Sequence, residues 1–152
     1  AETVWERANC STALAPARLL ETRSGIGMTT VDGRHAGVGQ LASGTPYVLD
    51  VTGRGGVPSD ADAVTVTVTA VDPSDLGYVT AYPCDQPRPN ASNLNHAHGE
   101  TVANAVLLPV TANGTVAGIE SRRSELQFDV RCRAFLGTNV QKKTARLTSQ
   151  HP

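Results

Sequence analysis

Aromatic residues are scarce in this sequence: one Trp, three Tyr and two Phe make up 4% of its 152 residues. Val, Leu and Ala must therefore fill any hydrophobic core. Charged residues are also few, at 18% of the chain against a usual ~25%. Thr, Ser, Asn and Gly supply the polar surface instead, and this composition favours an extracellular β protein over a cytosolic helical one.

Neither sign of charge dominates, because the formal net charge is −1 and the pI is near 6.5. No field of one sign is available to attract nucleic acid or an anionic membrane. No apolar run reaches the ~18 residues that a transmembrane helix needs. We therefore expect no nucleic-acid partner and no membrane insertion. Because no hydrophobic segment precedes Ala1, we interpret the chain as the mature form of a secreted protein.

The three cysteines, Cys10, Cys84 and Cys132, allow one disulfide and leave one thiol over. Their spacing fits no zinc site, since neither C-x-x-C nor H-x-x-x-H occurs. One structural disulfide in a secreted domain is favoured over a redox or metal site. Cys10–Cys132 is the preferred pairing, because it would join the N-terminal segment to the last core strand, and the other pairings stay open.

Motifs of catalysis are missing as well. No G-x-S-x-G nucleophile elbow occurs. The glycines at 53–56 are not a phosphate loop, because no Lys-Ser/Thr follows them. We expect a protein that is not an enzyme, with no catalytic residue, no resident metal and no cofactor.

The clearest positive signal is the stretch 63–70, A-V-T-V-T-V-T-A. Strict alternation places Val64, Val66 and Val68 on one face of a strand and the threonines on the other. Both residue types are β-branched, which suits a pleated sheet and disfavours a helix. Such a strand has one buried and one wet face, as in an antiparallel sandwich or barrel.

Other segments show similar strand patterns, separated by turn signals every 8–12 residues. We expect strands at 18–22, 47–52, 77–83, 101–110 and 125–135. Asp72-Pro73 predicts a hairpin over 63–83, and Ala112-Asn113-Gly114 predicts a second hairpin. Seven or more short strands indicate an all-β chain, a single antiparallel β-sandwich of immunoglobulin-like or jelly-roll-like type. The sequence divides into an extended N-terminal lead (1–15), the sandwich (16–136) and a C-terminal tail (137–152).

Four stretches together resemble a known module: PARLLETR at 16–23, the segment 53–84 that begins GRGGVP, RPNASNLNHAHGETVANAVLLPV at 88–110, and ELQFDVRCRAF at 125–135. This module occurs, often repeated, in secreted and cell-surface proteins of actinobacteria. The resemblance implies a non-enzymatic β-sandwich that accompanies hydrolases, adhesins and wall-associated proteins. The chain departs from the pattern at Glu21, where Asp is usual, and it lacks the second cysteine near Ala117 that often pairs with the one at Cys84.

Two clusters are weighed as metal sites. His96 and His98 lie two residues apart, so a strand would point both rings to one face, with Glu100 as a third ligand. The favoured interpretation is two exposed polar residues before a turn. Four aspartates, Asp60, Asp62, Asp72 and Asp75, could gather calcium, but no D-x-D-x-D-G loop occurs. Capping of the turn before the strand is favoured for Asp60 and Asp62.

Arginines and asparagines are the remaining candidates. A structural role, tying loops together through backbone carbonyls, is favoured for the whole set: Arg18, Arg23, Arg54, Arg88, Asn90, Asn93 and Asn95. The functional hypothesis is a glycan site in which amides bind sugar hydroxyls and a ring stacks on the sugar. Its predicted residues are Tyr78, Tyr82, Arg88, Asn90, Asn93 and Asn95.

The sequence therefore predicts a non-catalytic, secreted or surface-displayed binding and attachment module, with extracellular glycan or cell wall as the partner. The second hypothesis is a self-assembling structural subunit: an oligomer, a filament, or a decoration or fibre protein in the virion of an actinobacterial phage. Its partners would be copies of itself, joined where an extended arm adds to a sheet edge.

Overall fold

The computed structural model describes residues 11–111, 115–122 and 127–136, and this part of the chain contains eight strands and no helix. The prediction of an all-β chain with seven or more strands is confirmed. The strands are β1 (Ser11–Glu21), β2 (Tyr47–Asp50), β3 (Ala63–Val71), β4 (Gly77–Tyr82), β5 (Leu94–His96), β6 (Val102–Pro109), β7 (Thr115–Arg122) and β8 (Gln127–Leu136).

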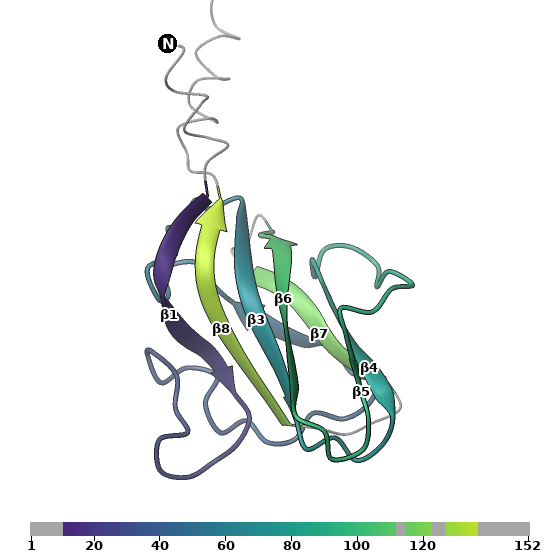
Figure 1. Cartoon of the computed structure of the whole chain (residues 1–152). Helices are drawn as coiled ribbons and strands as arrows, with labels where there is room; N and C mark the ends of the chain where they lie inside the picture. Colours follow the sequence, from purple (N-terminus) through teal and green to yellow (C-terminus); the bar gives the residue numbers. More distant parts are fainter. Residues whose placement is uncertain (1–10, 112–114, 123–126, 137–152) are drawn as a thin grey trace, which may run out of the picture.

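The strands form two four-stranded sheets. The first sheet has the order β1-β8-β3-β6 and the second has the order β2-β7-β4-β5. All strand pairs in both sheets are antiparallel. Figure 1 shows β1, β8, β3 and β6 side by side, with β7, β4 and β5 of the second sheet to the right of β6 in this view.

Strand β3 lies inside the first sheet, paired with β6 on one side and β8 on the other. Its side chains alternate as predicted: Val64, Val66 and Val68 are at most 1% exposed, whereas the threonines between them are half-buried. The valine face packs in the core together with residues of the second sheet, which removes it from water.

One hydrophobic core lies between the two sheets. The first sheet contributes Leu20, Val66 and Phe128, and the second contributes Leu49 and Val79, each at most 1% exposed. Each such side chain contributes roughly 1.5–3 kcal/mol when it is removed from water. Branched aliphatic residues supply most of this core, as the low aromatic content requires.

Both predicted hairpins are wrong. Strand β3 belongs to the first sheet and β4 to the second, and the same holds for β6 and β7. The Asp72-Pro73 turn reverses the chain, with Asp72 at a φ of +48°, but it carries the chain across to the other sheet. Turn residues specify a local reversal and not the strand that will pair next. In this fold, strands such as β1 and β8 pair across more than a hundred residues.

The N-terminal boundary also differs from the expected one. The short strand predicted at 18–22 is the end of the longer strand β1, whose first residue, Ser11, pairs with Leu136 of β8. Residues 11–15 of the predicted lead are therefore part of the sheet. The pairing shifts register between Ala13 and Ala17, around Pro16, which has no N–H to donate. Residues 1–10 and the tail 137–152 lie outside the described residues.

The structure describes two of the three cysteines, and these two are not joined to each other. Cys84 is exposed and Cys132 is fully buried. Cys132 faces the core, as its strand parity predicts, and burial raises the pKa of its thiol. The preferred partner, Cys10, lies outside the described residues, so the Cys10–Cys132 bridge stays a prediction without support from the structure.

Phe128 is the largest fully buried side chain among the described residues. Its truncation therefore tests whether the two sheets share one hydrophobic core. The Phe128→Ala variant is expected to lose about 3–5 kcal/mol of unfolding free energy in a urea titration, because it leaves a cavity between the sheets. Leu107 on β6 is 57% exposed and is the control. Leu107→Ala is expected to change the same quantity by less than about 0.5 kcal/mol. Equal losses in the two variants would contradict the assigned core.

Candidate functional site

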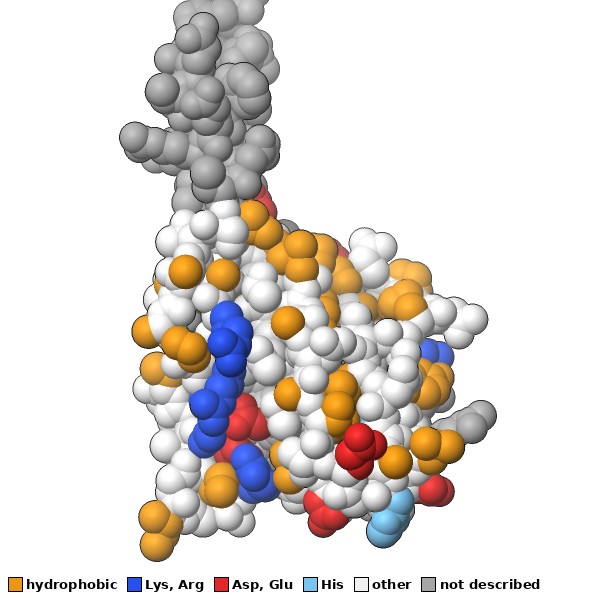
Figure 2. Space-filling view, in the orientation of Figure 1, with side chains coloured by type: hydrophobic (Ala, Val, Ile, Leu, Met, Phe, Trp, Pro, Cys, Tyr) orange, Lys and Arg blue, Asp and Glu red, His pale blue; other side chains and the backbone are white. Residues whose placement is uncertain are grey.

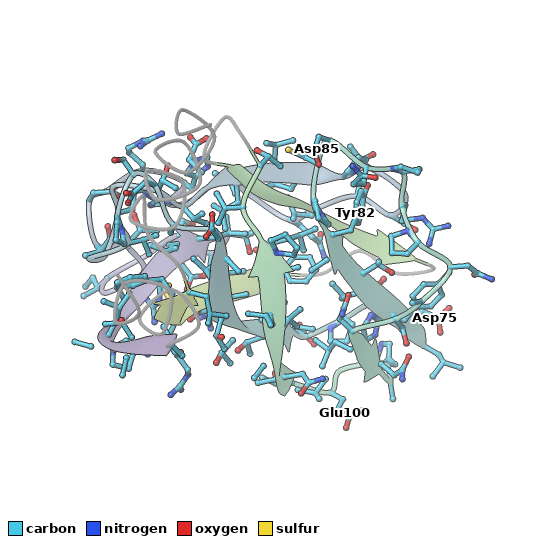
Figure 3. All side chains as sticks on the ribbon, turned by 90° about the horizontal axis from the view of Figure 1, so that it is seen from above. Asp75, Tyr82, Asp85 and Glu100 are labelled. Atoms are coloured by element: carbon cyan, nitrogen blue, oxygen red, sulfur yellow. The ribbon has the colours of Figure 1, made fainter. Side chains whose placement is uncertain are left out.

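The outer face of β4 carries the predicted glycan-binding tyrosines. Tyr78, Thr80 and Tyr82 alternate with core residues, so all three point away from the other sheet. The loop 83–93 folds back over this face, and the Thr80 hydroxyl donates a 2.6 Å hydrogen bond to the carbonyl of Ala91. Thr80 and Tyr82 are buried, whereas Tyr78 stays partly exposed. Figure 3 labels Tyr82, the last residue of β4, and Asp85, near the start of the loop.

Asn93 fixes the end of this loop. Its backbone N–H donates to the Val79 carbonyl (2.9 Å), and its side-chain Oδ1 accepts from the Ala81 N–H (2.7 Å). The Asn104 side chain of β6 donates to the Asn93 carbonyl (2.7 Å). Because the side chain is engaged with the backbone of β4, Asn93 positions the loop.

A cavity of about 260 Å³ lies where the loop meets β4, lined by Tyr78, Asn90, Ala91 and Ser92. Asn95 pairs with Tyr78 across β4 and β5 and is exposed on the same face. The cavity is slightly smaller than the ~300–1,000 Å³ of most small-molecule sites. It offers one aromatic ring together with amide and hydroxyl groups.

The structure sorts the six predicted site residues into different places. Tyr78 and Asn90 line one cavity, and Asn95 lies beside them. Tyr82 is buried under the loop, Asn93 holds the backbone, and half-buried Arg88 is on the loop away from the cavity lining. Ala91 and Ser92 were missed. Their only sequence signal was a position inside an irregular Pro/Asn-rich stretch, which predicts a loop but not the side of the loop that faces a cavity.

The histidine pair is divided between the core and the surface. His96, in β5, is only 2% exposed and faces inward, whereas His98 follows the strand and is exposed. The favoured expectation of two exposed polar residues is wrong for His96, because β5 places it on the same inner face as Leu94. Within the described residues, no group of three or more His, Cys, Asp or Glu could hold a metal ion.

The four aspartates weighed for calcium do not converge. Asp60 and Asp62 precede β3, whereas Asp72 and Asp75 follow it, so the nine-residue strand separates the two pairs. Asp62 connects elements through its backbone: its N–H donates to the Leu136 carbonyl (2.8 Å), and its carbonyl accepts from Val110 (2.9 Å).

The favoured structural role of the arginines is confirmed at Arg54. Its side chain, 1% exposed, donates to both oxygens of Asp32 (2.7 and 2.8 Å) and to the carbonyls of Asp50, Leu19 and Arg34. These hydrogen bonds hold the pKa of the Asp32 carboxyl well below its usual range. Three segments that are distant in sequence meet at this one guanidinium.

A further polar cluster next to Arg54 had no sequence signal. The His35 ring contacts the Tyr47 hydroxyl through Nδ1 (2.6 Å) and the Asp50 carboxylate through Nε2 (3.3 Å). His35 has a φ of +55°, which is rare for a residue with a side chain. Burial raises the pKa of the Tyr47 hydroxyl. The cluster fastens the loop 28–37 to β2.

Comparisons with protein-family models, with curated proteins and with solved structures gave no match. No helix in the described part of the chain could cross a membrane.

His96 predicts a dependence of stability on pH. Burial lowers its pKa, and the Asp75 backbone and the Glu100 charge oppose this more weakly. Neither ring nitrogen has a hydrogen-bond partner of normal geometry among the described residues. The unfolded chain therefore binds this proton at a higher pH than the folded one. The free energy of unfolding should be highest above about pH 6.5 and fall as the pH decreases below it.

The His96→Leu variant should lose most of this decrease between about pH 7 and pH 5, measured by denaturant titration at each pH. His98→Leu, a change at an exposed histidine, should keep it. A pH dependence that is the same in His96→Leu and in the unaltered protein would contradict the assignment. Glu21, whose pKa is lowered by hydrogen bonds from Arg23 and by the charges of Arg23 and Arg18, acts in a separate window below about pH 4.5.

Proposed function

We propose that this chain is a non-catalytic, extracellular attachment module with a β-sandwich fold of immunoglobulin-like or jelly-roll-like type. Its ligand is a glycan of an extracellular or cell-wall surface. The observation that carries the proposal is the cavity at Tyr78, Asn90, Ala91 and Ser92, which combines an aromatic ring with amide and hydroxyl groups.

The chemistry of the cavity suits a sugar. A pyranose has an apolar face of C–H groups that packs on an aromatic ring, and hydroxyls at its rim that exchange hydrogen bonds with amides. Tyr78 is the partly exposed ring at this position, and Asn90 and Ser92 supply the polar groups. The loop is held at Thr80 and Asn93, so little order has to be gained on binding.

Composition and motifs support the same proposal. The sequence is rich in Thr, Ser, Asn and Gly, a composition that favours an extracellular β protein. The stretches at 16–23, 53–84, 88–110 and 125–135 resemble the module of secreted actinobacterial proteins, which accompanies wall-associated and adhesive proteins. Secretion and surface display are part of this proposal.

The test uses purified actinobacterial cell wall as the probe in a sedimentation binding assay. Tyr78→Ala is expected to weaken binding roughly tenfold, because it removes the ring on which the sugar would pack. Tyr78→Phe keeps the ring and should bind within about twofold of the unaltered protein. Equal binding by Tyr78→Ala, or no binding by the unaltered protein, would refute the proposal.

Self-assembly is the second candidate function, and a specific observation favours it. Two of the four edge strands expose a large apolar side chain: Val48 of β2 is 50% exposed and Leu107 of β6 is 57% exposed. Edge strands have unpaired backbone groups, and apolar residues there favour pairing with another chain. A subunit of an oligomer, a filament or a virion would use such edges.

Size-exclusion chromatography with light scattering tests this second candidate. A structural subunit should give an oligomer whose mass does not change on dilution, and Leu107→Lys with Val48→Lys should dissociate it by placing charges at both edges. Leu76→Lys adds the same charge on the exposed connection between β3 and β4 and should leave the oligomer intact. A monomer at every concentration would exclude self-assembly.

A further inference from the structure

A row of arginines crosses the outer face of the first sheet. Arg131 and Arg133 of β8 lie on either side of Cys132, which points into the core, so both arginines face outward. Arg18 of β1 pairs directly with Arg131, and Arg23 follows the end of β1. Figure 2 shows Lys and Arg side chains in a column over this face. We refer to Arg18, Arg23, Arg131 and Arg133 as the arginine row.

Two carboxylates lie within the row. Asp129 is 5% exposed and lies 3.0 Å from Arg18 and 3.3 Å from Arg131, and fully buried Glu21 lies 2.8 Å from Arg23. Burial alone would raise the pKa of Glu21, but hydrogen bonds from Arg23 and the charges of Arg23 and Arg18 outweigh it and lower the pKa. Four guanidinium groups thus surround two carboxylates, an excess of two positive charges.

Arg18 and Arg23 use their guanidinium groups for contacts within the protein, whereas Arg131 and Arg133 keep guanidinium nitrogens available for a ligand. Arg18 donates to the carbonyls of Gly27 and Thr29, and Arg23 donates hydrogen bonds to both carboxylate oxygens of Glu21 through Nε and Nη2. Arg133 uses Nε for the Thr67 hydroxyl (2.7 Å), and Arg131 makes only long contacts, 3.3 and 3.4 Å, with Asp129. Within the described residues, the Arg133 Nη nitrogens and Arg131 Nη1 have no partner, so they are held in place and open to a ligand.

The spacing and chemistry of the arginine row indicate which kind of anionic partner it would bind. The two outward arginines are two residues apart on one strand, about 7 Å along it, a spacing that an extended chain of regularly repeated anions can meet. Guanidinium groups bind carboxylate and phosphate through paired hydrogen bonds. Half-buried Thr65, Thr67 and Thr69 of β3 place hydroxyls beside the row.

Aromatic residues are missing from this face in the part of the chain that the structure describes. Phe128 and Phe135 pack in or against the core, and Tyr47, Tyr78 and Tyr82 belong to the second sheet. Single-stranded nucleic acids are normally held by stacking on aromatic rings, and duplexes by larger basic surfaces. Hydroxyls beside guanidinium groups match an acidic sugar chain better.

We infer that the arginine row is a binding surface for a linear anionic glycan, with Arg131 and Arg133 contacting successive acidic groups. The surface lies on the sheet opposite to the Tyr78 cavity, and it goes beyond the proposed function. Both surfaces can therefore be occupied at once.

Binding of polygalacturonate, measured by isothermal titration calorimetry, tests the inference, with neutral dextran as the reference polymer. The unaltered protein should bind polygalacturonate and not dextran, and the affinity should fall as salt rises from about 0.05 to 0.5 M, because salt screens charges. The double variant Arg131→Gln/Arg133→Gln should bind at least about tenfold more weakly, since two charged hydrogen-bonding groups are removed.

Two controls separate this surface from others. Arg34→Gln removes one positive charge at an exposed arginine that pairs with Asp50 of β2, in the other sheet, and should bind polygalacturonate normally. Tyr78→Ala should also bind it normally, so failure of the cavity proposal would not affect this result. Unchanged binding by the double variant, an equal loss in Arg34→Gln, or tighter binding to single-stranded DNA than to polygalacturonate would overturn the inference.

Discussion

Removal of the inward-facing side chains of β3 and β8 from water is the interaction on which the rest of the structure depends. Val66 and Phe128 lie on adjacent strands and face residues of the second sheet such as Val79. With so few aromatics available, many short branched side chains must pack together. The two sheets therefore have to be long and well paired, and every functional feature is confined to their outer faces, edges and loops.

Several loops in this protein are held by polar side chains in addition to the core, which Val57 and Ala61 extend into the connection between β2 and β3. Arg54 binds carbonyls from three segments, and Asn93 bonds the backbone of β4. A buried arginine with all three side-chain nitrogens engaged is stable only when the surrounding acceptors stay in place. The same kind of contact that keeps the loop 83–93 against β4 thus also shapes the Tyr78 cavity.

The sequence predicted the features that depend on local patterns, such as a strand and its buried face. It did not predict the features that depend on contacts between distant segments, such as which strands pair. Alternation at 63–70 identified β3 and its buried face, because period and branching act within one strand. The hairpins at Asp72-Pro73 and Asn113-Gly114 failed, because a turn signal does not say to which sheet the next strand belongs. The burial of His96 follows from where β5 pairs, which no local pattern reveals. Tyr78 and Asn90 were predicted as site residues from their chemistry, but the loop that brings them together is a tertiary feature.

The antiparallel pairing of β1 with β8 has a mechanical consequence. Ser11 is paired with Leu136, so the segments that precede β1 and follow β8 leave from the same end of the same strand pair (Figure 1). Tension applied through these two points would separate the strands one backbone hydrogen bond at a time, from that end inward, and would not load all of the bonds together. A tether anchored at both points would therefore yield at low force by peeling, whereas a load that enters through an outer face and leaves through the end of β8 would bypass this seam, because β8 is also paired with β3.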